Sequence, residues 1–210
     1  MAKKRFVKGL ERRQANRSAR IRIIIVCEGS NTEPRYFEDF ARHYANRLVK
    51  LELIAGAGVP MTLVNRAIEA KTRLPRKSSF EKGDTVWAVF DRDDHPLVDE
   101  ARAKAAASGV GVAYSNPCFE VWPMLHFGPF DAPDGRHQVQ NKLAAKDPSY
   151  DSDSSKVVDF ALIVDQLDNA IARAEQMRAR RIEEDDEFGA PYTDVDVLAA
   201  LIRSNGNTQD

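Results

Sequence analysis

The sequence contains few cysteines. Its 210 residues include two, Cys27 and Cys118, and each stands among apolar residues. Two cysteines cannot build the disulfide framework of a small secreted protein or a four-cysteine zinc site. We therefore expect both to be small core residues, without a nucleophilic role, in a protein of the reducing cytoplasm.

Long apolar runs and glycine-rich phosphate loops are also missing. The apolar run nearest the N-terminus, Ile23 to Cys27, has five residues and is followed by Glu28. It is too short for a signal peptide or a membrane span, so we predict no membrane association. Gly29, Gly56 and Gly58 do not fit a Walker or Rossmann motif, so we do not expect the chain to hydrolyse ATP by itself.

The composition that is present is typical of a globular domain. Hydrophobic residues make up 43% of the chain and charged residues 30%, which excludes a collagen-like, wholly disordered or membrane-embedded protein. A chain of this length buries roughly 70% of its unfolded surface, so its core needs no disulfide or metal. The formal net charge is −1.

Charge is distributed unevenly along the chain. Residues 1–22 contain nine basic residues and one glutamate, a balance of +8, whereas the rest of the chain carries −9. We predict that residues 1–20 form a flexible basic arm, which either binds a polyanion, lies on the acidic body or is a solvated tail. If the arm binds a nucleic acid, the contacts are expected from Lys3, Lys4, Arg5, Arg12 and Arg13.

Strand and helix patterns alternate between residues 21 and 127. Strands are predicted at 21–26, 50–54, 85–90 and 110–114, with helices beginning near residues 31, 60 and 96. Such alternation predicts an α/β fold with a mainly parallel, Rossmann-like sheet flanked by helices. We take residues 21–127 as the core of the domain.

Beyond Tyr114 the sheet pattern stops. Asn116 and Pro117 predict the start of a helix, and Pro123 predicts a kink within it. Gly, Pro, Asp and Ser are frequent in residues 128–155, which predicts a loop or insertion. Residues 156–210 are expected to add a helical part to the same domain, with a long helix at 157–181, an acidic linker at 183–187 and a last helix at 194–203.

Acidic residues follow two of the predicted strands. Glu28 follows the first, and Asp91, Asp93 and Asp94 follow Phe90. Ligands of a parallel sheet bind outside the carboxyl ends of its strands, and Asp91 and Asp93 can face one cation together. Hard oxygen ligands of this kind suit Mg²⁺ or Mn²⁺. Alternatively, the aspartates cap the following helix and Glu28 pairs with an arginine of the arm.

Several side chains near these strand ends are further candidates. Glu120 could supply another metal ligand or be an acid favoured near a helix N-terminus. Ser115 and Asn116 could contact a phosphate or cap a helix, and His95 could contact the substrate beside the aspartates. His126 lies on an apolar face, where a packed core histidine is the usual outcome.

Three stretches, in this order and spacing, resemble the RloB-like proteins, which have a Toprim-like fold. They are IIIVCEGSNTEPRYF, VWAVFDRDDH and SNPCFEVWPMLHF, and the closing PYTDVDVLAALI is also similar to that family. Toprim domains carry a glutamate after the first strand and an Asp-x-Asp after the third, positions that match Glu28, Asp91 and Asp93. The resemblance implies Mg²⁺ binding by these acids and cleavage or rejoining of phosphodiester bonds. It also implies a role in phage defence beside a partner ATPase.

Two functional hypotheses follow. In the first, the chain is a Mg²⁺-dependent nuclease acting on DNA or RNA, including tRNA, in which Asp91 and Asp93 hold the metal, Glu28 is a ligand or general acid or base, and Glu120 completes the site. In the second, it is a non-catalytic Toprim-like module that binds a nucleic acid or an ATPase. A phosphatase that forms an aspartyl-phosphate fits less well, because its nucleophile normally ends an early strand.

The basic arm generates a first testable prediction. Deleting residues 1–20 should weaken binding to long DNA or RNA, because each lost phosphate contact removes about 0.9 from the salt slope of the affinity on duplex DNA. The measurement is the dissociation constant as a function of salt concentration for the full chain and the shortened chain. An unchanged affinity with an unchanged slope would show that the arm is a solvated tail.

Overall fold

The computed structural model describes residues 21–45, 49–56, 58–74, 83–92, 97–154 and 156–206. The predicted basic arm lies outside these residues, and so do Asp93, Asp94 and His95. The fold and the site are therefore described from the remaining side chains.

Five strands form one sheet, in the order β2-β1-β3-β4-β5. Strands β1 to β4 are parallel to one another, and β5 is antiparallel to β4. They are β1 (Ile21–Cys27), β2 (Val49–Ile54), β3 (Thr85–Asp91), β4 (Gly111–Asn116) and β5 (Tyr192–Thr193). This mainly parallel sheet confirms the predicted α/β class and is compatible with a Rossmann-like fold.

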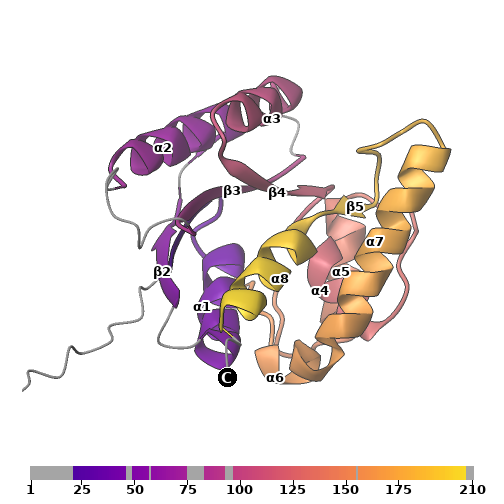
Figure 1. Ribbon diagram of the computed structural model, residues 1–210. Coiled ribbons are helices and arrows are strands. Elements are labelled where there is room, and N and C mark those ends of the chain that lie inside the picture. Colours follow the sequence, from indigo (N-terminus) through magenta and orange to yellow (C-terminus); the bar gives the residue numbers. More distant parts are fainter. Residues whose placement is uncertain are drawn as a thin grey trace, which may run out of the picture.

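Helices cover both faces of the sheet (Figure 1). One face carries α2 (Pro60–Thr72) and α3 (Val98–Ala107). The opposite side carries α1 (Thr32–Tyr44), α4 (Val121–Phe127), α5 (Arg136–Ala144), α6 (Phe160–Ile163), the 3₁₀ turn Val164–Gln166, α7 (Leu167–Glu183) and α8 (Val195–Gly206). In the part of the chain that the structure describes, no helix combines the length and apolar character needed to cross a bilayer.

Strand β1, which lies between β2 and β3, is buried on both of its faces. Ile23 and Ile25 pack into the core beneath α1, whereas Ile24 and Val26 pack into the core beneath α2. This explains why the strand is a continuous β-branched run and does not alternate with polar residues. The two cores fix β1 firmly, and with it the position of the residue that follows Cys27.

The helix predicted to begin at Asn116 begins instead at Val121. Strand β4 continues to Asn116, and the side-chain amide of Asn116 donates to the backbone oxygen of Phe188 at 2.7 Å, so this residue does not cap the helix. Pro123 consequently lies in the first turn of α4. Backbone N–H groups in a first turn have no helical partner, so the reason for predicting a kink disappears.

The prediction for residues 128–155 was wrong, because they contain α5 where a loop or insertion was predicted. Val139 and Leu143 of this helix are fully buried in the core beneath α1, called here the main core, although the flanks of the helix are rich in Gly, Pro and Asp. The long helix predicted at 157–181 starts later and is divided. The side chain of Asp159 accepts a hydrogen bond from the backbone of Ala161, α6 follows, and α7 begins at Leu167.

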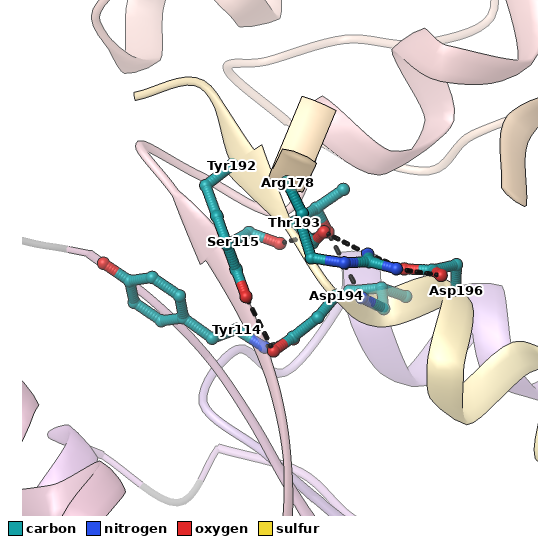
Figure 2. Close-up of polar contacts among 8 residues, drawn as sticks. Tyr114, Ser115, Arg178, Tyr192, Thr193, Asp194 and Asp196 are labelled. Atoms are coloured by element: carbon teal, nitrogen blue, oxygen red, sulfur yellow. Dashed lines mark hydrogen bonds and ion pairs between the residues drawn. The ribbon is translucent and has the colours of Figure 1, made fainter. Parts of the chain in front are cut away.

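The C-terminal segment closes the sheet through a network of polar contacts that Figure 2 shows. The backbone N–H of Tyr114 donates to Asp194 Oδ1 at 2.5 Å, and the Ser115 and Thr193 hydroxyls lie 3.1 Å apart. Arg178 of α7 contacts both carboxylate oxygens of Asp196, one of them at 2.8 Å. Arg178 also donates to the backbone oxygen of Thr193 at 2.8 Å, so the short strand β5 is attached both to β4 and to α7.

A substitution in α5 tests whether this helix belongs to the core. Leu143→Ala should lower the free energy of unfolding by about 2–5 kcal/mol, because it leaves a cavity in a fully buried position. Asn141→Ala, at an exposed position of the same helix, should change it by less than about 0.5 kcal/mol. Urea unfolding followed by circular dichroism measures both. Equal stabilities of the two variants would show that α5 does not contribute to the core and that this segment is peripheral.

Candidate functional site

The sheet changes its direction of growth beside β1. From β1 the chain passes to β2 on one side and then returns to β3 on the other side, and β4 extends the sheet further. A crevice at such a point lies outside the carboxyl ends of the two central strands. Glu28 follows β1 directly, and Asp91 is the last residue of β3.

Glu28 and Asp91 lie side by side, as the strand ends predicted. The backbone N–H of Asp91 donates to Glu28 Oε2 at 3.2 Å. The backbone N–H of Glu28 in turn donates to the carbonyl of Val89 at 3.0 Å, which continues the pairing of β1 with β3. The sheet register therefore determines how the two acids meet.

These acids line a cavity of about 290 Å³ at this edge of the sheet. Of the described residues that line it, four are acidic (Glu28, Glu33, Asp91 and Glu120) and two are basic (Arg136 and Lys156). The turn from Gly29 to Thr32 forms another part of the wall. The cavity thus gathers negative charge beside a smaller amount of positive charge.

Sequence reasoning missed Glu33, which lies in the first turn of α1 and is buried. Its Oε1 accepts a hydrogen bond from the backbone N–H of Gly29 at 3.3 Å. A Cβ at Gly29 would collide with this carboxylate, so a larger residue at this position would force the Glu33 side chain to move. A glutamate near a helix N-terminus is common for electrostatic reasons alone, so Glu33 did not stand out as a site residue. Its place five residues after Glu28, just beyond the end of β1, was the one signal that could have identified it.

Glu120 is buried at the residue that precedes α4. Its Oε1 accepts hydrogen bonds from the Tyr150 hydroxyl at 2.5 Å and from Gln140 Nε2 at 3.2 Å. Gln140 belongs to α5, and Tyr150 follows that helix. The segment predicted as a loop therefore holds one of the predicted metal ligands in place.

Arg136, the first residue of α5, was also not predicted. Its Nη2 lies 3.5 Å from Asp91 Oδ2, and its side chain remains 33% exposed. No local pattern predicts this contact, since 45 positions separate the two residues. The two side chains meet only because α5 packs against the main core.

The charged forms of the buried acids are disfavoured. Burial raises the pKa of Asp91 well above its usual range, repulsion by Glu33 and Glu120 raises it further, and Arg136 opposes the shift. Burial is also the main cause that raises the pKa of Glu33 from 4.5 to about 6. Neighbouring carboxylates of this kind become favourable when a cation neutralises them.

The donor set fits Mg²⁺ or Mn²⁺. Among the described residues no three His, Cys, Asp or Glu side chains form a ready-made metal site. Mg²⁺, however, usually takes one or two carboxylates and keeps several waters as its other ligands. The adjacent Glu28 and Asp91 could therefore supply the carboxylate ligands that it needs. Asp93, predicted to share the ion with Asp91, lies outside the described residues.

Other candidates from the sequence do not line the cavity. Ser115 is the register partner of Asp91 on β4, but its hydroxyl is buried against that of Thr193, and the side chain of Asn116 binds the backbone of Phe188. His126 is a core residue, as expected: its Nδ1 lies 3.1 Å from the carbonyl of Trp122, and burial lowers its pKa to about 4.

The two cysteines are core residues as well. Cys27 and Cys118 are both fully buried, and burial raises the pKa of each thiol. A thiol in this environment stays protonated at neutral pH and is a poor nucleophile. This agrees with the expectation that neither cysteine is catalytic.

The fold and the cavity define an α/β protein with buried carboxylates at the switch point of a mainly parallel sheet. Residues 23–202 match the family described as RloB-like protein, and the chain belongs to that family. The match covers most of the chain and confirms the resemblance found in the sequence motifs. No curated protein and no solved structure matches the chain significantly.

The raised pKa of Glu33 predicts a pH-dependent stability. The folded state holds this proton more tightly than the unfolded state, so ionising Glu33 destabilises the fold as the pH rises from 4.5 to about 6. Glu33→Gln keeps the acceptor for Gly29 and removes the charge. In EDTA above the upper pH it should raise the free energy of unfolding by at most about 2 kcal/mol, and below the lower pH the gain should vanish.

Denaturant unfolding across this pH range measures the effect. The matched control is Glu38→Gln, an exposed position on the same helix, which should change little at any pH. A Glu33→Gln variant that is less stable than the parent at neutral pH would contradict the predicted charge repulsion.

Proposed function

We propose that this chain is a divalent-metal-dependent nuclease that cleaves phosphodiester bonds in DNA or RNA, tRNA included. The observation that carries the proposal is the set of four carboxylates, Glu28, Glu33, Asp91 and Glu120, in one cavity at the switch point, of which the last three are buried. Membership of the RloB-like family supports it, because the resemblance implies a Toprim-like fold with an acid site at the same strand ends.

Mg²⁺ or Mn²⁺ is the proposed cofactor. Asp91 and Glu28 would hold the ion, with Asp93 and Glu120 as further ligands. Such an ion, when bound, polarises a phosphoryl oxygen and lowers the pKa of a coordinated water. The acids are suited to it because they are hard oxygen donors whose mutual repulsion it would offset.

The chain's own residues then have separate tasks. Glu28, which the sheet register fixes beside Asp91, would take up or release a proton at its carboxylate. Tyr150 and Gln140 would keep Glu120 oriented toward the cavity, since both donate to the same oxygen. The basic arm would follow the nucleic-acid backbone outside the site.

A partner ATPase is part of the proposal. The sequence has no Walker motif, so any dependence on ATP would come from another chain. The family resemblance implies such a partner and a role in phage defence. A nuclease that is controlled by a separate ATPase fits both the missing Walker motif and the family resemblance.

Replacing Asp91 tests the site directly. Asp91→Asn keeps the size of the side chain and removes the charge, so we expect loss of metal-dependent cleavage and loss of phage restriction in cells that carry the neighbouring ATPase. Metal at about a hundred times its Kd should raise the unfolding free energy of the parent by about 2.7 kcal/mol and should leave the variant unchanged. In EDTA the variant should melt at the same temperature or higher, because repulsion is relieved.

The matched control is Asp99→Asn, which removes an acid whose side chain is 70% exposed on α3. It should retain activity and the full metal-induced shift in melting temperature. An Asp91→Asn variant with full activity and a full metal response would remove Asp91 from the site. The non-catalytic module that binds a nucleic acid or an ATPase would then be the better description.

A further inference from the structure

The acidic cavity continues into a groove along α1. A second cavity, of about 350 Å³, shares Ser30 and Asn31 with the acidic cavity. A third, of about 590 Å³, shares Arg35 and Val157 with the second. Cavities that share lining residues in this way form one continuous depression. The second and third cavities together are called here the α1 groove.

The α1 groove leads from one edge of the sheet to the other. Helix α1 connects the end of β1 with the start of the parallel strand β2, so it runs from the carboxyl edge of the sheet back to the amino edge. Between Asn31 and His43 a helix rises about 18 Å, which corresponds to about five nucleotides at the stacked spacing of about 3.4 Å. Ile21, which follows the predicted basic arm in the sequence, begins β1 at the amino edge. The groove therefore joins the edge with the acids to the edge where the arm is attached.

The wall that α1 contributes carries two arginines. Arg35 and Arg42 lie on one face of the helix, seven positions apart, and both line the groove. Each pairs with an acid of the same helix: Arg35 with Glu38 at 3.6 Å, and Arg42 with Asp39. Because the arginine side chains are 57% and 70% exposed, these ion pairs contribute little to stability. A phosphate, which accepts two guanidinium donors at once, can therefore replace the carboxylate at little cost.

The opposite wall is the segment that leads into α6, residues 157–160. The fully buried Asp147 holds this segment, since its carboxylate accepts the backbone N–H of Ser149 at 2.9 Å and that of Asp159 at 2.7 Å. The carboxylate of Asp159 in turn caps α6 by accepting the backbone N–H of Ala161 at 3.0 Å. The groove thus has a wall that is fixed by the fold.

Aromatic rings stand at the end of the groove nearest the amino edge. The ring centroids of His43 and Phe160 lie 6.0 Å apart, and both residues line the groove. Figure 1 shows α6, which begins with Phe160, near the C-terminal end of α1. Proteins that bind single-stranded nucleic acids combine cationic side chains along the backbone with aromatic rings on which bases stack. The α1 groove offers both kinds of side chain.

We propose that the α1 groove binds a single strand of the nucleic-acid substrate. The phosphate to be cleaved would lie at the acids, the neighbouring phosphates at Arg35 and Arg42, and a base against His43 beside Phe160. Glu38, Asp39 and Asp159 keep the described lining of the groove close to neutral, so the basic arm would supply most of the net attraction for a polyanion. This inference rests on the proposed nuclease function and adds the path of the substrate strand to it.

The test compares Arg42→Gln, the double variant Arg35→Gln/Arg42→Gln, His43→Ala and the control Arg73→Gln in the full chain. Arg73 matches Arg42, because it is 75% exposed and pairs with Glu69, but it lies at the end of α2 on the other face of the sheet. Anisotropy measures the binding of fluorescein-labelled single-stranded DNA and RNA of about eight nucleotides, in EDTA and in Ca²⁺, over a range of salt concentrations. The same RNA with 4-thiouridine is photo-crosslinked, and mass spectrometry identifies the linked peptide.

The double variant should bind the oligonucleotides about tenfold more weakly, with a salt slope flatter by about 1.4, which is about 0.7 for each phosphate contact on a single strand. Arg42→Gln should show about half of the change in slope. His43→Ala should weaken binding about fivefold with little change in slope, because base stacking releases no counterions. Arg73→Gln should match the parent, and the crosslinks should fall on peptides that contain His43 or Phe160.

Parent-like affinity and slope in the double variant would overturn the inference and leave the groove to another occupant, such as a peptide segment of a partner protein. An equal loss in Arg73→Gln, or a parent that binds no single strand, would overturn it as well. Failure of the nuclease proposal looks different. The parent would then bind single strands in a manner that depends on Arg35 and Arg42, but without metal-dependent cleavage and without a Mn²⁺-induced shift in melting temperature.

Discussion

Repulsion among the carboxylates that gather at the ends of β1 and β3 is the constraint on which the rest of the structure depends. Burial, together with repulsion by Glu33 and Glu120, raises the free energy of the charged form of Asp91, and burial together with repulsion by Glu120 does the same for Glu33. A fold can hold such a cluster only when its scaffold is rigid. Here the rigidity comes from two apolar cores that pack against opposite faces of β1.

Elements far apart in the sequence contribute to the relief of this repulsion. The turn after β1 offers the N–H of Gly29 to Glu33, and β3 offers the N–H of Asp91 to Glu28. The region after α4 supplies Gln140 and Tyr150 to Glu120, and the start of α5 supplies Arg136 to Asp91. Apart from Arg136, these donors are neutral, and they orient the carboxylates without cancelling their charge. A negative cavity of defined shape is the result, which is what a cation site requires.

The sequence was most informative where one physical preference acted alone. The β-branched run of β1 has no alternation because both of its faces are buried, so the strand and the position of Glu28 could be predicted from residues 21–28. Pro60 begins α2 as its fixed geometry suggests. Predictions were wrong where tertiary packing overrode a local signal: α5 was hidden by flanking turn residues, and Asn116 resembled a helix cap but ends β4. Arg136 and Tyr150 escaped because their site contacts are long-range.

The motifs that the chain shares with its family thus divide into two physical classes. The EGSNTE and FDRDD stretches supply carboxylates to the cavity, where their charge is unfavourable for folding. The PYTD stretch also contains a buried acid, Asp194, whose pKa burial raises to about 6, but that carboxylate accepts the backbone N–H of Tyr114 and joins β5 to the sheet. Glu28 and Glu33 also accept backbone N–H groups, but they lie among the other carboxylates of the cavity, whereas Asp194 lies outside it. The surroundings of each acid, and not its place in a shared motif, therefore distinguish the residues of the candidate site from those that build its scaffold.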